Sequence, residues 1–237
     1  MEENTVLDRL MLFGLTRQEA AIYLCLFQNG EMTGYEVSKQ TGISRSNVYS
    51  GLSDLVEKGA AYLAEGTTSK YIAVPAEEFC ENIIRSLSKE KEYLIANLPS
   101  RKEKDLGYIT ISGSRNIKDK MITMINGAEM RIYFSASYKM IEELQEEFHK
   151  VLDKKIKLVL ITDALPKDIR LKSESICHLG ERKENSIRLI VDSAYALTGE
   201  LTESKEDTCL YTGQKNFIEV FKDALRNEIR LIELTKE

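Results

Sequence analysis

The stretch Ser44-Arg-Ser-Asn-Val-Tyr-Ser-Gly-Leu-Ser-Asp-Leu-Val-Glu-Lys-Gly59 has the pattern of a single amphipathic helix. Apolar residues recur in it at helical spacing, and the positions between them are mostly small and polar. The apolar residues are Val48, Leu52, Leu55 and Val56. Ser44 is placed to cap the start of the helix, and Gly59 can adopt the left-handed conformation that ends one.

A second, shorter helix is predicted just upstream, over residues 34–40. The turn Thr41-Gly-Ile43 joins the two helices, which is typical of a helix-turn-helix. In such a motif the later helix, here the one that begins after Ser44, enters the major groove, so small polar residues and an early arginine suit it. The predicted DNA contacts on this helix are Arg45, Ser46, Asn47, Tyr49 and Ser50.

Two short apolar segments, 60–64 and 70–74, flank a polar turn that contains glycine. This pattern predicts a β-hairpin, and a hairpin directly after a helix-turn-helix makes a winged helix. Thr68, Ser69 and Lys70 are the predicted wing contacts with DNA. We therefore expect an α+β winged-helix DNA-binding domain over residues 1–75. Winged helices that bind other proteins instead of DNA share the pattern, and this alternative stays open.

The composition is that of a soluble globular protein: 237 residues, 43% hydrophobic and 30% charged, enough for two domains. No apolar run approaches a membrane span, and the start is acidic, so we expect a cytoplasmic protein without membrane contact. Four scattered cysteines and two histidines indicate neither a metal site nor a disulfide framework, and no cofactor is predicted. The net charge is −5, and residues 1–75 hold six Lys and Arg against nine Asp and Glu. Because this region has so few cations, we expect its affinity for DNA to be modest and strongly dependent on salt.

Residues 76–105 are predicted to form a long linker helix that starts after Pro75. Apolar residues repeat along it at near-heptad spacing: Cys80, Ile83, Leu87, Leu94 and Leu98. Such a stripe favours pairing with the same helix of a second copy, and so a homodimer. A solvated connecting helix is the alternative.

From residue 106 to 237 the pattern alternates strand, helix, strand, helix, strand, which indicates an α/β domain with a mostly parallel sheet. The first three strands are expected near residues 108–111, 131–134 and 157–161, with one helix over 137–152. A hairpin around Asp192-Ser193, a last strand at 209–212 and a helix over 214–234 complete the domain.

Ligands of parallel α/β sheets bind beyond the carboxyl ends of the strands. Polar residues follow each of the first three strands: Ser112, Ser114, Arg115, Ser135, Ser137, Thr162 and Asp163. We expect them to bind a small polar effector, either a sugar or a carboxylated or phosphorylated metabolite. Ordinary helix caps would show the same residue types.

The chain resembles the TrmB family of transcriptional regulators, which has sugar-responsive members. The resemblance lies in the stretches 15–23, 43–49, 52–59, 111–117 and 128–133, for example Leu15-Thr-Arg-Gln-Glu-Ala-Ala-Ile-Tyr23. It implies a first domain that binds operator DNA, a dimerising long helix, and a phospholipase-D-like C-terminal domain that binds an effector.

An enzyme of the phospholipase D type would need a histidine nucleophile followed two residues later by lysine. His149 is followed by Lys-Val and His178 by Leu-Gly, so neither makes this motif. No phosphate-binding loop, dinucleotide-binding pattern or nucleophile elbow is present either. The sequence therefore predicts a regulator and not an enzyme.

Overall fold

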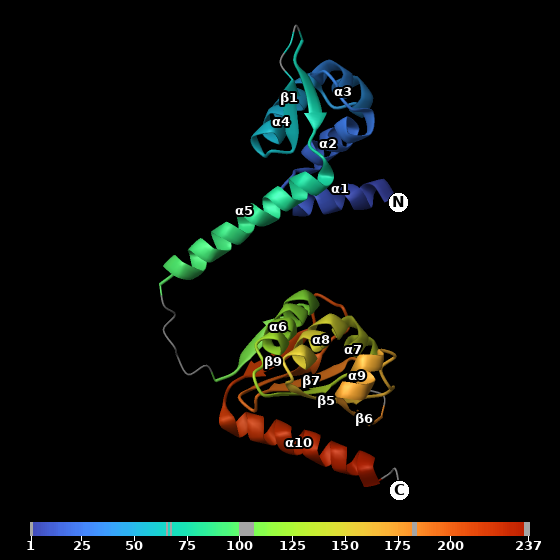
Figure 1. The fold of residues 1–237 in the computed structure, drawn as a ribbon, viewed down its shortest axis with the longest axis vertical. Helices are drawn as coiled ribbons and strands as arrows, with labels where there is room; N and C mark the ends of the chain where they lie inside the picture. The colour runs from blue at the N-terminus through green and yellow to red at the C-terminus, as the bar shows by residue number, and fades with distance from the viewer. Residues whose placement is uncertain (1, 65, 67, 100–106, 182–183, 235–237) are drawn as a thin grey trace. The chain divides into compact units, whose positions relative to one another are not determined.

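The computed structural model describes residues 2–64, 66, 68–99, 107–181 and 184–234. The chain forms two compact units, Met1–Arg101 and Lys102–Glu237, each with its own hydrophobic core. The first unit is helical with one two-stranded sheet, and the second is an α/β unit built on a seven-stranded sheet (Figure 1).

The first unit has the order of a winged helix. Its elements are α1 (Glu2–Leu12), α2 (Arg17–Asn29), α3 (Gly34–Thr41), α4 (Arg45–Glu57), β1 (Ala61–Ala64), β2 (Lys70–Ala73) and α5 (Ala76–Asn97). Two capping boxes, Thr16 with Glu19 and Thr33 with Glu36, start α2 and α3. Gly42 ends α3 in the left-handed conformation, with φ of 71°. The predicted helix-turn-helix and hairpin are therefore confirmed.

An ion pair beside the helical core fastens the end of α4 to the start of α2. Lys58 Nζ lies 2.6 Å from Glu19 Oε2 and also donates to the Gly14 carbonyl. Glu19 is only 5% exposed. Burial opposes its ionisation, but Lys58 and the Thr16 N–H and hydroxyl outweigh burial and lower its pKa. The carboxylate is thus held charged within the fold.

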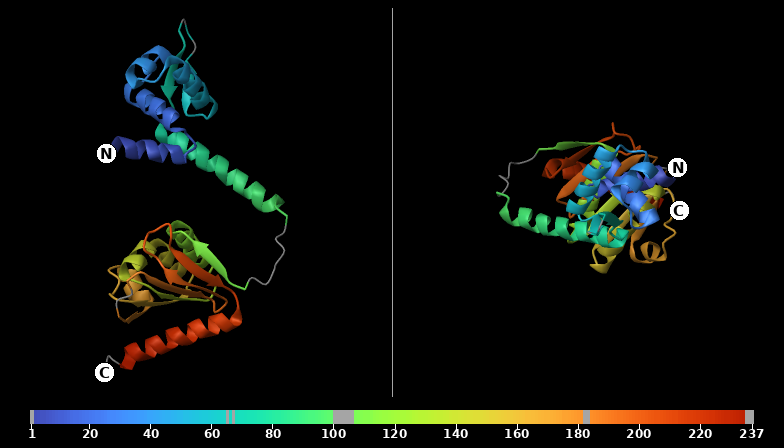
Figure 2. Two further views of the ribbon diagram at one scale, coloured as in Figure 1. Left: turned by 180° about the vertical axis from the view of Figure 1, so that it is seen from behind. Right: turned by 90° about the horizontal axis from the view of Figure 1, so that it is seen from above.

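Helix α5 ends at Asn97, earlier than the predicted 105, and residues 100–105 lie outside the described part of the chain. Leu98 is already extended, with ψ of 136°, because Pro99 disfavours helical backbone in the residue before it. Only the first turns of α5 pack on the winged-helix core, through Phe79, Cys80 and Ile83. The rest of the helix extends away from α1–α4, as the left view of Figure 2 shows.

The second unit has one sheet between two helical layers. Its elements are β3 (Ile109–Ser112), α6 (Ser114–Asn126), β4 (Arg131–Ser135), α7 (Tyr138–Glu143), α8 (Gln145–Asp153), β5 (Lys157–Thr162), α9 (Ile169–Glu174), β6 (Ile176–Leu179), β7 (Ser186–Val191), β8 (Tyr195–Glu200), β9 (Thr208–Thr212) and α10 (Lys215–Leu234). Helices α6 and α8 pack against one face, and α10 lies along the other (Figure 1).

The strand order is β3-β9-β8-β7-β4-β5-β6. Among the described strands, β4 pairs with β5 and β5 with β6 in parallel, while the other four pairings are antiparallel. The sheet is therefore mixed, and the expectation of a mostly parallel sheet is wrong. Strand β3 does not join β4; it pairs with β9 at the edge, because the β7–β8–β9 meander fills the space between β3 and β4.

The helix predicted over 137–152 is two helices. Leu144, with φ of −102° and ψ of 15°, breaks it between α7 and α8. Helix α9 was not predicted, because the segment around it is charged and has little periodicity.

Cys25 and Cys209 are buried, Cys80 and Cys177 are half-buried, and all four are free thiols. Burial raises the pKa of the Cys209 thiol to about 11. Within the described residues no single helix combines the length and apolar character of a membrane span; only the bent pair Thr5–Leu12 and Arg17–Asn29 meets both criteria together.

Candidate functional site

The outward face of α4 carries the five helix residues that the sequence analysis assigned to DNA. Arg45, Ser46, Asn47, Tyr49 and Ser50 are exposed. The opposite side of the helix, including Val48, Leu52 and Leu55, is buried against the core. Ser44 Oγ accepts from the Asn47 N–H and caps the helix start. A rigid helix thus presents short polar side chains and one guanidinium to solvent.

Tyr35 of α3 adds an aromatic side chain to this face that sequence reasoning missed. Its ring is 51% exposed, and the Arg45 guanidinium carbon lies 4.6 Å from the ring centroid. Tyr49 packs over Gly34, where an added Cβ would come within 2.7 Å of the Tyr49 ring. The two tyrosines therefore frame the start of α4. The sequence signal that could have indicated it is an aromatic residue at the start of α3, the first helix of the helix-turn-helix.

The wing places Lys70 beside an acid. Lys70 Nζ lies 3.3 Å from Glu31 Oε2, and both side chains are 45% exposed. Two backbone hydrogen bonds between Met32 and Tyr71 hold Glu31 in this position. An ion pair this exposed contributes about 0–1 kcal/mol, so a phosphate can compete for the lysine. Thr68 and Ser69 are exposed, whereas residues 65 and 67 lie outside the described chain.

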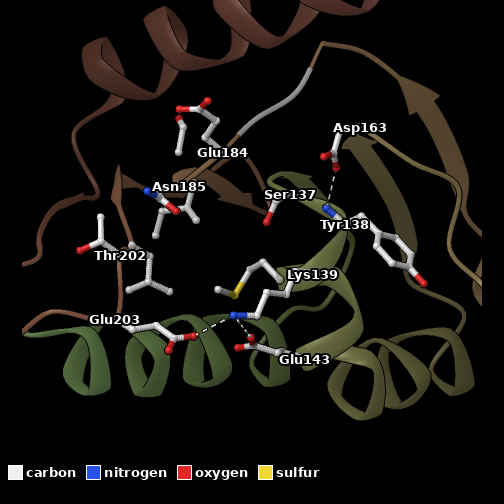
Figure 3. Close-up of a pocket in the computed structure, with 13 residues that line it drawn as sticks. Ser137, Tyr138, Lys139, Glu143, Asp163, Glu184, Asn185, Thr202 and Glu203 are labelled. Carbon is white, nitrogen blue, oxygen red and sulfur yellow. Dashed lines mark hydrogen bonds and ion pairs between the residues drawn. The ribbon is translucent and has the colours of Figure 1, made fainter.

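A cleft of about 570 Å³ opens at the ends of the central strands of the sheet in the second unit. It lies where β4, β5 and β8 end and β7 begins, and Figure 3 shows its side chains converging. We call it the acidic pocket. Its lining residues are Ser137, Tyr138, Lys139, Met140, Glu143, Asp163, Glu184, Asn185, Ser186, Ile187, Leu201, Thr202 and Glu203.

Four carboxylates and one ammonium line the acidic pocket. Lys139 Nζ lies 3.1 Å from Glu203 Oε1 and 3.8 Å from Glu143 Oε1. The hydrogen bond between Lys139 and Glu203 raises the pKa of the lysine and lowers that of the glutamate. Lys118, just outside, pairs with Glu143 at 2.8 Å. Negative charge still exceeds positive charge at this pocket.

Asp163 and the backbone of two glutamates shape the acidic pocket. The Tyr138 N–H donates to Asp163 Oδ1 at 2.7 Å, so this carboxylate already occupies the start of α7. Glu184 and Glu203 have φ of 46° and 68°. Residues other than glycine adopt this conformation at a cost of about 1–3 kcal/mol, and such strain clusters at functional sites.

The structure brings together two of the predicted effector residues, Ser137 and Asp163, at this pocket. Ser135 and Thr162 are buried, with 2% and 0% exposure. The other three, Ser112, Ser114 and Arg115, follow the edge strand β3, which stands four places from β4 in the sheet. None of the three lines the acidic pocket, although the Ser114 N–H donates to the carbonyl of Ser204, the residue after the lining residue Glu203. Sequence reasoning missed the residues before β7 and after β8, because it looked for ligand contacts only after the first three strands and did not place the β7–β8 hairpin beside β4.

Neither histidine lines the acidic pocket. His149 Nε2 lies 3.0 Å from Asp168 Oδ1, and this hydrogen bond is the main reason why the Asp168 pKa is lowered. His178, on β6, has its Nδ1 3.9 Å from Glu233 Oε1. Among the described residues, no group of three or more His, Cys, Asp or Glu side chains is arranged to hold a metal ion.

Comparison with known proteins matches both units to one family. Residues 10–77 match the model "Sugar-specific transcriptional regulator TrmB". Residues 107–228 match the model of the TrmB "EBD N-terminal subdomain", which covers just over half of the chain.

Two curated relatives are similar over most of the chain. The uncharacterized protein YrhO of Bacillus subtilis is 30% identical over 166 residues, 68% of this chain and 59% of that protein. The sugar-sensing regulator TrmBL1 of Pyrococcus furiosus is 28% identical over 183 residues, 74% and 53% of the two chains. The chain thus spans a little over half the length of each.

A solved structure of TrmBL2, described as an archaeal chromatin protein with a novel mode of DNA binding, is 19% identical. The alignment covers 96% of this chain and 98% of that one, with a TM-score of 0.46. Because the family models match both units, the chain belongs to the TrmB family of transcriptional regulators.

Proposed function

We propose that this protein is a transcriptional regulator that binds operator DNA through α4 and the wing. The observation that carries the proposal is the exposed face of α4, where short polar side chains and Arg45 stand clear of the core. A helix of this kind can approach base edges in the major groove, while Thr68, Ser69 and Lys70 are placed to contact the backbone.

Sequencing genomic fragments retained by the purified protein tests this proposal. A regulator should enrich a common motif, whereas a winged-helix module that binds proteins should enrich none. Affinity for the enriched motif should then fall in an Asn47→Ala/Ser50→Ala variant and stay unchanged in Ser86→Ala/Ser88→Ala, which removes two exposed polar side chains from α5. Failure to enrich any motif at low salt would refute DNA binding.

We also propose that two copies pair through α5, because operators with two half-sites need two DNA-binding heads. Ile84, Leu87 and Leu94 lie along the helix at spacings of three and seven residues, and Leu98 follows four residues later, just past its end. Each is between 51% and 65% exposed. This spacing matches the seam of a two-stranded coiled coil.

The acidic pocket is our proposed effector site, and its charge narrows the ligand class. An excess of carboxylates repels carboxylated or phosphorylated metabolites, whereas the hydroxyls of a neutral sugar can donate to these oxygens. Ser137, Asn185 and Thr202 add neutral hydrogen-bonding groups. We therefore infer a neutral polyhydroxyl ligand. No catalysis is assigned to the pocket, since neither histidine lines it.

Thermal-shift measurements with neutral sugars and their phosphates test this assignment. A neutral sugar should raise the melting temperature, and its phosphate should not. Glu203→Gln/Asn185→Ala should abolish the shift, while Glu206→Gln, in the same loop but outside the pocket, should keep it. A ligand that regulates must also change operator affinity. A ligand that binds the DNA-binding and the non-binding states of the protein equally well does not shift the equilibrium between them. A phosphate that binds more tightly than its sugar would refute the ligand class.

A further inference from the structure

A groove on the face of the sheet that carries α10 differs from the acidic pocket in position and chemistry. Tyr133 of β4 and Ile190 of β7 are cross-strand partners and form its floor. One flank of α10 forms its wall, and its volume is about 310 Å³. We call it the basic groove. The wall residues are Lys222, Leu225, Arg226, Ile229, Arg230 and Glu233.

The basic groove has apolar side chains on its floor and at the base of its wall, and two of them are partly uncovered. Ile190 and Leu225 are buried in the small core under α10, whereas Tyr133 and Ile229 are only half-buried and pack at its margin. A ligand lying in the groove would cover these two side chains. Burying apolar area contributes about 25 cal/mol per Å², so the floor favours a hydrocarbon body.

The wall is cationic although the chain as a whole carries a net charge of −5. Its charged lining residues are the three cations Lys222, Arg226 and Arg230 and one carboxylate, Glu233. Arg226 also pairs with Asp223 at 2.6 Å, but both side chains are more than half exposed, so a bound anion can compete for the guanidinium.

Two further cations stand on the same face of the sheet. Strand residues alternate between faces, so Arg131 shares the face of Tyr133, two residues on. Lys157 of β5 is the direct cross-strand partner of Arg131. Both are exposed. Positive charge therefore lies both on the helix wall and on the sheet beyond the floor.

We propose that the basic groove binds a small amphipathic organic anion, with an apolar body on Tyr133 and Ile229 and one carboxylate among Lys222, Arg226 and Arg230. Sites of this type combine an apolar floor with a few convergent polar groups, and guanidinium groups hold carboxylates in a bidentate manner. The volume corresponds to about ten water molecules, which suits a chain of about eight carbons. This site is separate from the proposed effector site, whose carboxylates would repel such a ligand.

Octanoate titrated into the full chain, labelled with ¹³C at isoleucine δ1 methyls, tests the proposal directly. The signals of Ile190 and Ile229 should shift and saturate, because both side chains line the groove. Ile95 of α5 is 73% exposed and reports non-specific adsorption. It should not shift. Equal responses from Ile95 and Ile229, or none from Ile190 and Ile229, would overturn the proposal.

Charge-neutral variants and a neutral ligand separate the role of the cations from that of the floor. Arg226→Gln/Arg230→Gln should weaken octanoate binding at least tenfold with an unchanged circular dichroism spectrum. Lys205→Gln/Lys215→Gln makes the same charge change at exposed residues outside the groove and should bind as the wild type does. Octanol should bind at least tenfold more weakly than octanoate. Equal binding of octanol, or wild-type affinity in the arginine variant, would show that no anion site exists.

Discussion

The Arg45 guanidinium carbon lies 4.6 Å from the centroid of the Tyr35 ring, which joins the two helices of the helix-turn-helix across their outer face. The contact is a cation–π interaction at a half-exposed site, and it limits the conformations of an otherwise flexible side chain. Arg45 is therefore held in position before any DNA arrives.

Arg45→Ala should weaken operator binding by about 1–3 kcal/mol if the guanidinium contacts a base. Tyr35→Leu should cost about 0.5–1 kcal/mol through loss of the cation–π contact. In the double variant the two losses should not add, because both act on one guanidinium. Fluorescence anisotropy measures this cycle. Phe27→Leu, an exposed aromatic on α2, is the matched control and should bind normally. Strictly additive losses would mean that the tyrosine does not position the arginine.

Lys70 and Lys58 should have opposite roles, although the sequence places both near the DNA-binding helix. Lys70→Ala should lower the slope of log affinity against log salt by about one unit, since one phosphate contact is lost. Lys58→Ala should leave the slope unchanged but destabilise the first unit by roughly 1–3 kcal/mol, because the buried Glu19 carboxylate loses its cationic partner and keeps only its hydrogen bond from Thr16. Binding titrations at several salt concentrations and urea unfolding distinguish the two. An unchanged slope for Lys70→Ala would remove the wing from the interface.

Asp192 pins the β7–β8 hairpin to the start of β4. Its carboxylate accepts from the backbone N–H groups of Glu129, Met130 and Arg131 at 2.8–2.9 Å. Burial opposes ionisation here, but the three donors outweigh it and lower the pKa of Asp192. A carboxyl group whose pKa is lowered by folding stabilises the folded state at pH values above its ordinary pKa of 3.8. This stabilisation is lost as the pH falls through the pKa of the folded state.

Asp192→Asn should therefore destabilise the second unit by about 1–3 kcal/mol at pH 7, and the difference from wild type should shrink below about pH 4. Asparagine tolerates the positive φ of 53° at this position, so the substitution changes the charge and not the backbone. Urea unfolding at pH 7, 5 and 3.5 measures the effect. Asp119→Asn, an exposed helix position, is the control. A pH-independent difference would show that ionisation of Asp192 does not contribute.

Gly199 of β8 is a point of close contact between strands. A Cβ at this position would lie 2.5 Å from the Thr208 carbonyl oxygen and 2.8 Å from the Cys209 Cα, both backbone atoms that cannot move independently. Gly199→Ala should therefore destabilise the unit by about 1–3 kcal/mol. At Gly213 an added Cβ would lie 3.3 Å from the Tyr195 ring and 3.7 Å from the Ala194 carbonyl oxygen, so Gly213→Ala should cost less. Thermal unfolding ranks the two, and the reverse order would contradict the packing of β8 on β9.

Pairing through α5 predicts that Leu87→Ser/Leu94→Ser converts a dimer to a monomer in sedimentation equilibrium at micromolar concentration. The substitutions remove two of the four apolar side chains that each copy contributes to the proposed seam. Lys89→Ser/Glu92→Ser makes two substitutions to serine at exposed polar positions on the same helix and should remain dimeric. A wild-type monomer would refute the proposal, as would a dimer that persists in the leucine variant.

The winged helix was predictable because its signals are local. Ser44, Thr33 with Glu36, and Gly42 each mark a helix boundary within a few residues of the bond or backbone conformation that forms it. The start of α5 at Pro75 follows from the same kind of evidence. The exposed residues of α4 that we propose as DNA contacts were identifiable for this reason, whereas the contact between Tyr35 and Arg45 depends on the angle between two helices.

The sheet of the second unit was predictable only in part, because strand order depends on distant pairings. The strands themselves have clear patterns, but nothing near Ile109 indicates that its partner is Tyr211 and not a residue of β4. The predicted set therefore includes Ser112, Ser114 and Arg115, which do not line the acidic pocket, and omits Asn185 and Thr202, which do. Ser137 and Asp163 do lie together at the acidic pocket, because β4 and β5 are adjacent and parallel.

The pairing of β3 with β9 also sets the order in which the chain can fold as it is synthesised. The Thr212 hydroxyl donates to the Gly107 carbonyl across 105 positions of sequence, and β3 has no other strand partner among the described strands. Loop closure over such a separation is slow compared with the local contacts of a helical unit. The winged helix can form as soon as it leaves the ribosome, whereas β3 must wait, unpaired, until β9 has been made. A nascent chain arrested before Thr208 would leave β3 and the β9-facing side of β8 without their strand partner.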